Sequence, residues 1–254
     1  MTRVIALVNQ KGGVGKTTST INIGAGLAKK GKRVLLVDLD PQGNLTYSLG
    51  IKADEVNPTI YQVMKDEATA KDAIIKGEFD VIPANIQLSG AELELSSVAG
   101  RELILKEALE PLLPDYDYIL IDAPPALNML TVNALTACQE VFIPLQAEYL
   151  SLNGMLQLTN TVALVSKRLN NDLKITGVIA TLYDARKNLN REVIEAIQER
   201  FKDSLFKTYI RDNIALAEAP SYGKDIFSYQ PNSNGASDYL KLVDEIIKQE
   251  GGGV

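Results

Sequence analysis

The sequence predicts an α/β fold with a single doubly wound, mostly parallel sheet and helices on both of its faces. Short apolar runs alternate with helical patterns along all 254 residues. The runs are apolar on both faces of a strand, as in Val34-Leu35-Leu36-Val37, which is typical of strands covered on both sides. Because no linker interrupts this alternation, we expect one domain over residues 1–254, with residues 251–254 as a disordered tail.

The expected strands are apolar runs bounded by turn-forming residues. In chain order they are Val4–Val8, Arg33–Asp38, Phe79–Pro83, Tyr118–Asp122, Glu140–Pro144, Ile175–Leu182 and a short run at Phe206–Ile210. The expected helices are the segments between them in which apolar residues recur at helical spacing. They include Thr17–Lys30, Arg101–Leu112, Tyr149–Leu169, Arg191–Phe201 and Ser237–Gln249.

The composition excludes several kinds of catalytic and metal site. Cys138 is the single cysteine, and the chain has no histidine. A disulfide within the chain, a four-cysteine zinc or iron–sulfur site within one chain and any histidine-dependent triad are therefore excluded. The chemistry must use carboxylates, lysines, hydroxyls, backbone amides and, where one binds, a metal ion.

Charge and hydropathy bear on partners and location. The net charge is −6, yet residues 167–225 carry 11 basic and 9 acidic residues, a net of +2, against 15 and 23 elsewhere, a net of −8. This mild asymmetry is by itself a weak indication of nucleic-acid binding. The apolar stretch ending at Val8 is too short for a signal peptide, and no run reaches the roughly 18 apolar residues that span a bilayer. We expect a cytoplasmic protein.

The strongest motif is a glycine-rich loop between the first expected strand and the first expected helix. It reads Lys11-Gly12-Gly13-Val14-Gly15-Lys16-Thr17-Thr18. Glycines let backbone amides surround phosphate oxygens, and the following helix N-terminus favours an anion. Lys16 can reach the β- and γ-phosphates of a nucleotide, and the Thr17 hydroxyl can ligate Mg²⁺. The alternative is a glycine-rich turn that merely caps a helix, which the position after a strand and the carboxylates described below disfavour.

The loop departs from the standard phosphate-binding pattern in one respect. Gln10 stands where that pattern has glycine, five residues before Gly15, and a second lysine, Lys11, opens the loop. This form resembles the deviant Walker A ATPases of the ParA/MinD superfamily, P-loop proteins that bind ATP with Mg²⁺. In that family the first lysine reaches across a dimer to the other subunit's nucleotide. The resemblance therefore implies an ATP-bound homodimer and a catalytic role for Lys11 beside Lys16.

Two further motifs end strands with carboxylates. In the run Asp38-Leu39-Asp40-Pro41, the resemblance implies that Asp38 lies near Mg²⁺ and that Asp40 positions the attacking water. An aspartate that caps a turn before Pro41 is the alternative. Asp122, after the apolar run from Tyr118, has the Walker B arrangement, in which the strand delivers a Mg²⁺ ligand to the phosphate loop. The following Ala123-Pro124-Pro125, with Thr131 and Asn133, is similar to the family's switch II.

Within the superfamily, the chain is similar to the ParA/Soj group of chromosome-partitioning ATPases. The segments 182–190, 213–224 and 229–236 carry this resemblance, so it spans nearly the whole chain. Cys138 offers no cysteine pair for the shared cluster of iron proteins and Mrp-like carriers, and reads as a small buried hydrophobe. The C-terminal helical pattern has mixed charge on its polar face, which is more typical of a helix packed on the core than of a lipid anchor.

The ParA/Soj resemblance implies a DNA-partitioning switch with weak ATPase activity. Its ATP-bound dimer would bind DNA non-specifically, associate with the nucleoid and hydrolyse ATP when a ParB-type partner stimulates it, without a membrane. The candidate DNA contacts, which can equally be solvated surface charges, are Arg186, Lys187, Arg191, Lys207, Arg211 and Lys224.

Two departures bear on the candidate site residues. The family often has arginine where this chain has Ala215 and proline where it has Arg211. Because this region contacts adenine in relatives, Arg211 and Asn213 are also candidate base contacts. Two alternatives stay open, a ParA-like positioner of a non-DNA cargo and a MinD-like membrane-cycling regulator of cell division.

Overall fold

A computed structural model describes residues 1–148 and 151–250. For residues 151–154 it describes the backbone alone. Its six strands form one sheet in the order β3-β2-β4-β1-β5-β6, and every neighbouring pair is parallel. The strands are β1 Arg3–Leu7, β2 Val34–Asp38, β3 Asp80–Ile82, β4 Tyr118–Asp122, β5 Glu140–Gln146 and β6 Lys174–Thr181. The predicted doubly wound parallel sheet is confirmed, because the chain moves outward from β1 first to one edge and then to the other.

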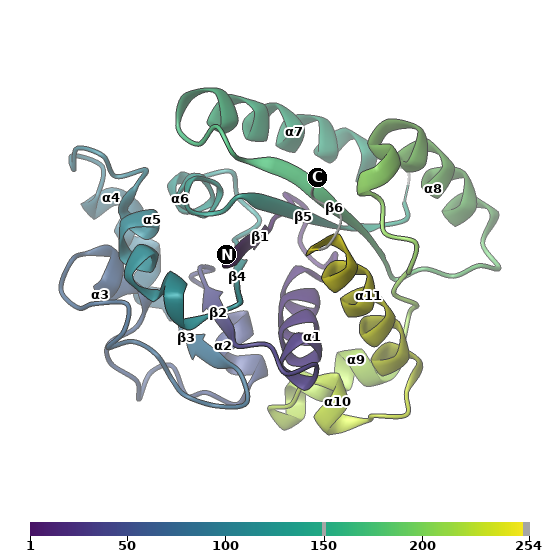
Figure 1. The fold of residues 1–254 in the computed structure, drawn as a ribbon, viewed down its shortest axis with the longest axis horizontal. Helices are drawn as coiled ribbons and strands as arrows, with labels where there is room; N and C mark the ends of the chain where they lie inside the picture. The colour runs from purple at the N-terminus through teal and green to yellow at the C-terminus, as the bar shows by residue number, and fades with distance from the viewer. Residues whose placement is uncertain (149–150, 251–254) are drawn as a thin grey trace.

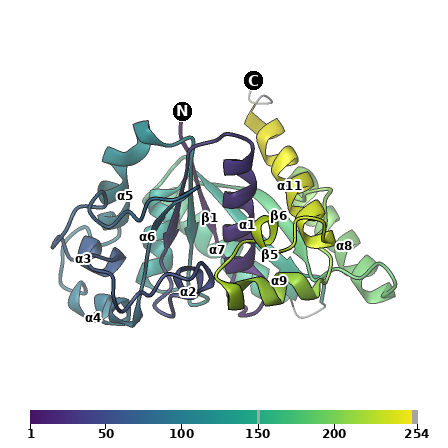
Figure 2. The ribbon, with the colours of Figure 1, turned by 90° about the horizontal axis from the view of Figure 1, so that it is seen from below.

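Helices cover both faces of this sheet (Figures 1 and 2). On one face lie α1 Lys16–Lys29, α2 Asn44–Ser48, α9 Ile214–Glu218, α10 Ile226–Tyr229 and α11 Asn234–Glu250. On the other lie α3 Ile60–Met64, α4 Ala91–Glu94, α5 Ile104–Leu109, α6 Met129–Ala137, α7 Ser151–Arg168 and α8 Asn188–Phe201. In the described part of the chain, no helix is both long and apolar enough to cross a membrane.

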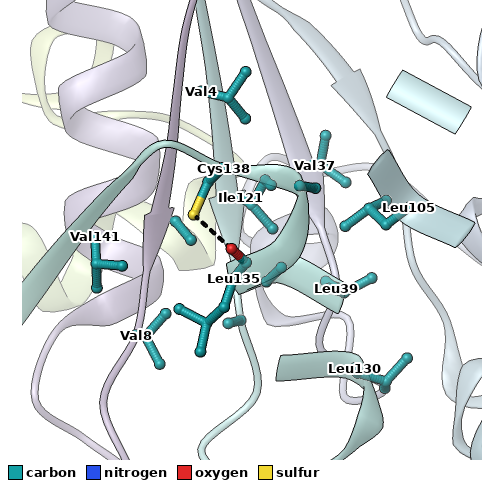
Figure 3. Close-up of a cluster of buried hydrophobic side chains, with 14 of the residues drawn as sticks. Val4, Val8, Val37, Leu39, Leu105, Ile121, Leu130, Leu135, Cys138 and Val141 are labelled. Atoms are coloured by element: carbon teal, nitrogen blue, oxygen red, sulfur yellow. Dashed lines mark hydrogen bonds between the residues drawn. The ribbon is translucent and has the colours of Figure 1, made fainter. Parts of the chain in front are cut away.

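The core consists of two apolar layers, one on each face of the sheet. Along β2, Val34 and Leu36 pack on the α1 and α11 side, whereas Leu35 and Val37 pack on the other side. This alternation explains why the strand is apolar at every position. Figure 3 shows part of the second layer, in which Cys138 lies among aliphatic side chains. The thiol is fully buried, and burial raises its pKa to about 12, so Cys138 serves as packing.

The predicted strand at Phe206–Ile210 is wrong. Phe206 and Ile210 donate backbone hydrogen bonds to Val178 and Ala180 of β6, but the chain between them leaves the ladder. There the amides of Lys207 and Thr208 donate to the Glu245 carboxylate of α11, at 2.9 Å each. What remains are two isolated bridges, one between Leu205 and Val178 of β6 and one between Arg211 and Tyr183, just after β6.

The two edge strands of the sheet, β3 and β6, each have some backbone hydrogen bonds on the side that faces away from the sheet. Beyond β3, Ile75 and Val81 exchange two hydrogen bonds as an isolated antiparallel bridge. Beyond β6, the segment 205–211 takes the carbonyls of Val178 and Ala180.

Three helices have boundaries that differ from the predicted ones. The expected helix Arg101–Leu112 is α5 followed by a 3₁₀ segment, Glu110–Asp115, because prolines interrupt it. Helix α8 begins three residues earlier than predicted, at Asn188, and α11 begins at Asn234. Tyr149 and the glycine tail, which the predictions include, lie outside the described residues.

The Gly177→Ala variant should unfold more easily than the wild type. A β-carbon at this position in β6 would lie 2.5 Å from Phe142 Cδ1 and 2.6 Å from Phe206 Cε2, two rings that pack edge to face. Overpacking of this kind costs about 1–3 kcal/mol, measurable by urea denaturation. As a control, Gly90→Ala meets only the flexible Glu94 carboxylate and should be near neutral. Equal stability of Gly177→Ala and the wild type would contradict this packing.

Candidate active site

The glycine-rich loop connects the end of β1 to the start of α1. Gly13 and Gly15 have φ of +73° and +80°, a left-handed conformation that side chains with a β-carbon disfavour. Gly15 is the N-cap residue of α1, and no side chain caps the helix there. The first amides of α1 thus face outward with their partial positive charge, which suits an anion.

Two polar residues that the sequence analysis did not identify hold this loop. The Asn9 amide donates to the Pro144 carbonyl at 2.7 Å, and its oxygen accepts from the Lys11 amide at 3.0 Å. From the other side, the Thr181 hydroxyl donates to the Val14 carbonyl at 2.8 Å. The contacts with Pro144 and Val14 join residues more than 130 positions apart, so no local pattern could have identified them.

The loop forms one end of a cavity of about 450 Å³. Its floor consists of loop and α1 residues, and its far wall belongs to the segment that follows β6 and precedes α9. The lining includes Gly12, Gly13, Gly15, Lys16, Thr17, Thr18, Asp40, Gln42, Thr181, Leu182, Arg211, Asp212, Asn213, Leu216, Ala217 and Tyr239. Most of the phosphate-loop residues and both candidate base contacts therefore face one space.

Asp38 and Asp122 end neighbouring parallel strands in the same register. Both carboxylates are buried, with at most 1% of the residue exposed. The Thr17 hydroxyl donates to Asp122 Oδ2 at 2.7 Å, and the Thr20 hydroxyl donates to Oδ1 at 3.3 Å. The three residues predicted to hold a metal, Thr17, Asp38 and Asp122, thus gather at one edge of the sheet.

Thr46 of α2 holds Asp38 and was missed by the sequence analysis. Its amide and its hydroxyl both donate to Asp38 Oδ2, at 2.9 and 2.7 Å. The same hydroxyl accepts from the Ala84 amide at 3.0 Å, which ties the residue to the end of β3. The Asp40 amide donates to Asp38 Oδ1 at 3.2 Å. Both oxygens of Asp38 are therefore held, Oδ1 by the loop after β2 and Oδ2 by α2.

Burial sets the protonation of these groups. It raises the pKa of Asp122 to about 8, and the neighbouring Asp38 charge adds to this rise. Burial also raises the pKa of Asp38 to about 6, against its hydrogen bonds from Thr46. Lys16 is buried as well, which lowers its pKa despite the attraction of Asp122 and Asp40. The carboxylates therefore have less positive charge nearby than their ionised forms require.

This donor set fits Mg²⁺. Hard carboxylate and hydroxyl oxygens are the ligands that Mg²⁺ takes in proteins, usually one or two carboxylates with phosphate oxygens and water. Within residues 1–148 and 151–250, no group of three or more acidic, histidine or cysteine side chains converges as a complete metal cage. A site of two carboxylates and a hydroxyl beside a phosphate loop is the kind that a nucleotide completes.

Asp40 and Lys11 occupy different surroundings. Asp40 lines the cavity and is nearly buried, and its Oδ1 accepts from the Gln42 amide at 2.9 Å. The Lys11 side chain is exposed and points away from its own loop. Its Nζ lies 2.6 Å from Glu148 Oε2, an ion pair in which both side chains are more than two-fifths exposed. In this conformation Lys11 neutralises Glu148 instead of facing the cavity.

Thr131 and Asn133, on α6, link the segment after Asp122 to its surroundings. The Thr131 hydroxyl donates to the Ala126 carbonyl at 2.6 Å. Asn133 is fully buried, donates to the Arg101 carbonyl at 2.8 Å and accepts from the Leu105 amide at 3.1 Å. Helix α6 thus connects the loop after β4 with α5.

Comparison with known proteins identifies the family. A model of the AAA domain matches residues 2–175. The chain is 54% identical to the sporulation initiation inhibitor protein Soj of Bacillus subtilis, over 97% of this chain and 98% of that one. It is 45% identical to the chromosome partitioning protein ParA of Myxococcus xanthus, over 98% of this chain and 89% of the other. The chain belongs to the ParA/Soj family.

The fold of this ParA/Soj family member also matches solved structures. A structure described as cobyrinic acid a,c-diamide synthase from Mycobacterium smegmatis superposes with a TM-score of 0.88 at 38% identity. The match covers 100% of this chain and 98% of that one, which was crystallised with an ATP analogue and magnesium.

The basic residues predicted to contact DNA do not share one location in this ParA/Soj protein. Arg186, Lys187 and Arg191 lie in or beside the loop between β6 and α8. The Arg186 guanidinium is 91% exposed but pairs with Asp184 at 2.9 Å. Lys207 lies beside α11, and Lys224 lines a separate cavity of about 280 Å³ next to α10.

Arg211 and Asn213, the candidate contacts to the base, are both held by hydrogen bonds. Asn213 is the N-cap residue of α9, and its side chain accepts from the Ala215 amide at 2.9 Å. The Arg211 guanidinium pairs with Asp238 at 2.7 Å, so it is less available to DNA than its charge suggests.

The Asp122→Asn variant should alter how the stability of the ligand-free protein depends on pH. In the unfolded chain Asp122 ionises near pH 4, whereas in the folded chain its pKa is about 8. Its contribution to folding is therefore complete below about pH 4 and is lost as pH rises through about 8. The stability of the wild type relative to the variant should fall across this window, by on the order of 1 kcal/mol per pH unit.

The measurement is urea denaturation of both proteins in chelator, without nucleotide, at several pH values. Asp117→Asn provides the control, because its pairing with Arg33 lowers the pKa of Asp117 to about 2, outside the window. A difference between wild type and Asp122→Asn that stays constant from pH 5 to 8 would contradict a carboxyl with a raised pKa.

Proposed function

We propose that this protein is an ATP-dependent DNA-partitioning switch. The observation that carries the proposal is that most of the phosphate loop and Asp40 line one cavity, in which Thr17 is hydrogen-bonded to the buried Asp122 carboxylate next to Asp38. Lys11 is instead paired with Glu148. The names of the relatives, Soj and chromosome partitioning protein ParA, support partitioning as the process served. Residues 1–254 would act together as one P-loop ATPase domain.

In the proposed nucleotide complex, ATP binds with Mg²⁺. The amides from Gly12 to Thr18 and the Lys16 ammonium would surround the phosphates. The Thr17 hydroxyl, with Asp38 and Asp122, would hold Mg²⁺, whose charge would satisfy the buried carboxylates. In the ligand-free site, where this charge is missing, burial raises the pKa values of both carboxyls.

The hydrolytic step would depend on Asp40 and Lys11. Asp40 lines the cavity with one oxygen bonded to a backbone amide, and would orient the water that attacks the γ-phosphate. Lys11 would leave Glu148 and reach the nucleotide of the second subunit, where its charge would stabilise the transferring phosphoryl group. We propose that ATP drives this homodimer, that turnover is weak alone, and that a ParB-type partner stimulates it.

The proposed dimer binds DNA non-specifically and associates with the nucleoid. Arg186, Lys187 and Arg191 are the best placed of the candidate contacts, since they cluster around one loop. Phosphate contacts of this kind require no base reading and are driven by release of counterions.

The two alternatives differ in what the switch carries. A ParA-like positioner of another cargo would use the same nucleotide site. A MinD-like membrane cycle is less well supported, because the apolar face of α11 is already occupied. Tyr239, Leu242, Val243 and Ile246 of this helix are at most 1% exposed and pack against the core.

If Lys11 acts on the nucleotide of the second subunit (its trans role), two variants should differ in their oligomeric state. Asp40→Ala should bind ATP, hydrolyse it slowly and accumulate as a dimer. Asp40→Ala/Lys11→Ala should bind ATP with similar affinity but stay monomeric, since the charge that joins the two subunits is lost. Size-exclusion chromatography with light scattering, in ATP and Mg²⁺, measures this.

The control is Asp40→Ala/Lys52→Ala, which removes another exposed, ion-paired lysine and should remain dimeric. A stable ATP-bound dimer of the Lys11 double variant would refute the trans role. Failure of the wild type to bind ATP at all would refute the proposed function.

The proposed DNA surface predicts opposite effects for two neighbours. Arg186→Glu should weaken DNA binding by the ATP-bound dimer, whereas Asp184→Asn should strengthen it, because Asp184 neutralises Arg186. Each lost phosphate contact should reduce the slope of log affinity against log salt by about one unit. Fluorescence anisotropy with duplex DNA at several salt concentrations measures both.

Arg33→Glu provides a matched control, because Arg33 is also exposed and paired with one aspartate, Asp117, but lies at the start of β2, opposite the nucleotide site. It should leave DNA affinity unchanged. Equal binding by Arg186→Glu and Arg33→Glu would show that the loop before α8 does not contact DNA.

A further inference from the structure

The far wall of the nucleotide cavity depends on one carboxylate of the C-terminal helix. Asp238, in the first turns of α11, accepts three hydrogen bonds from Arg211. Its Oδ2 accepts from the Arg211 amide at 3.2 Å and from Nε at 2.8 Å, and its Oδ1 accepts from Nη2 at 2.7 Å. The contact therefore fixes both the backbone and the guanidinium plane of Arg211.

The two partners differ in burial. The Asp238 side chain is only 5% exposed, whereas that of Arg211 is 44% exposed and lines the cavity. A buried carboxylate is stable only when donors satisfy it, and here the donors come from Arg211. The pair thus has an inner member that orients and an outer member that remains accessible to a ligand.

The adjacent residue of α11 reaches the other end of the cavity. The Tyr239 hydroxyl lies 3.0 Å from the Ser19 hydroxyl of α1, one residue beyond the phosphate loop, and Tyr239 itself lines the cavity. Tyr239 thus contacts α1, next to the phosphate loop, and the preceding residue, Asp238, contacts Arg211 at the opposite end of the cavity. The distance between these two ends is set through α11.

The two ends of the cavity suit different parts of a nucleotide. With its phosphates in the loop, the part of the cavity left for its base includes Leu182, Arg211, Asn213 and Leu216. A planar guanidinium binds the face of a purine by stacking and by cation–π attraction, and it does so best when its orientation is already fixed. Bidentate pairing with a carboxylate fixes that orientation.

We propose that Asp238 is a positioning residue that holds Arg211 against the adenine base and so sets the affinity for ATP through its nucleoside part. The inference rests on the proposed function, because it assumes that ATP occupies this cavity. It concerns the nucleoside alone, so phosphate binding should be independent of Asp238.

Three variants separate this role from a merely structural one. Asp238→Asn should weaken ATP binding by about tenfold, since the guanidinium loses its charged partner and its fixed plane. Arg211→Met should weaken ATP binding similarly and also destabilise the protein, because Asp238 is left buried without its cation. In the double variant Asp238→Asn/Arg211→Met, the stability should return toward that of the wild type, while the ATP affinity should stay low.

The measurements are urea denaturation for stability and calorimetric titration for affinity, with ATP and with inorganic tripolyphosphate up to millimolar concentration, both with Mg²⁺. Tripolyphosphate should bind all four proteins equally. The inference is overturned if Asp238→Asn binds ATP as the wild type does. It is also overturned if the variant loses tripolyphosphate in proportion, or if the double variant recovers ATP affinity together with stability. A wild type that binds neither ligand would instead refute the proposed function.

Discussion

Two carboxylates buried side by side constrain the rest of this structure. Asp38 and Asp122 occupy the same register position on adjacent strands, so the sheet cannot form without bringing them together. Burial and mutual repulsion work against ionisation of both, and hydroxyls of Thr17, Thr20 and Thr46 surround them as donors. The fold thus carries an internal electrostatic cost at the place where a cation and a phosphate chain are proposed to bind. Strain of this kind is expected where function is selected over stability.

Much of this arrangement could be predicted from the sequence because its signals are local. The six strands are apolar runs with turns at both ends, and the phosphate loop, Asp38 and Asp122 each follow such a run. Helix α6 was not predicted, because most of its residues are buried and it lacks the polar face that marks a helix in sequence.

Other features depend on residues far apart in the chain. The segment Phe206–Ile210 has the composition of a strand, but Glu245 of α11 takes the amides that the ladder would need. Likewise, Thr46, Asn9 and Thr181 contact the site through partners that no spacing rule connects to them. Charge alone suggested Arg211 as a DNA contact, yet its partner Asp238 lies 27 residues further on. Sequence patterns identify which groups are present, whereas tertiary contacts decide which of them remain free.

The paired edges of the sheet also bear on how copies of this protein can associate. Ile75 bonds both the amide and the carbonyl of Val81 on the outer side of β3, and the segment 205–211 donates to the carbonyls of Val178 and Ala180 on that of β6, so both edges are partly occupied. An uncovered edge would let one sheet continue into the next and would favour irreversible cross-β aggregation. A protein proposed to gather in many copies along one DNA molecule experiences a high local concentration. With both edges occupied in this way, crowding would bring such copies together without fusing their sheets, and the proposed nucleotide-controlled assembly would stay reversible.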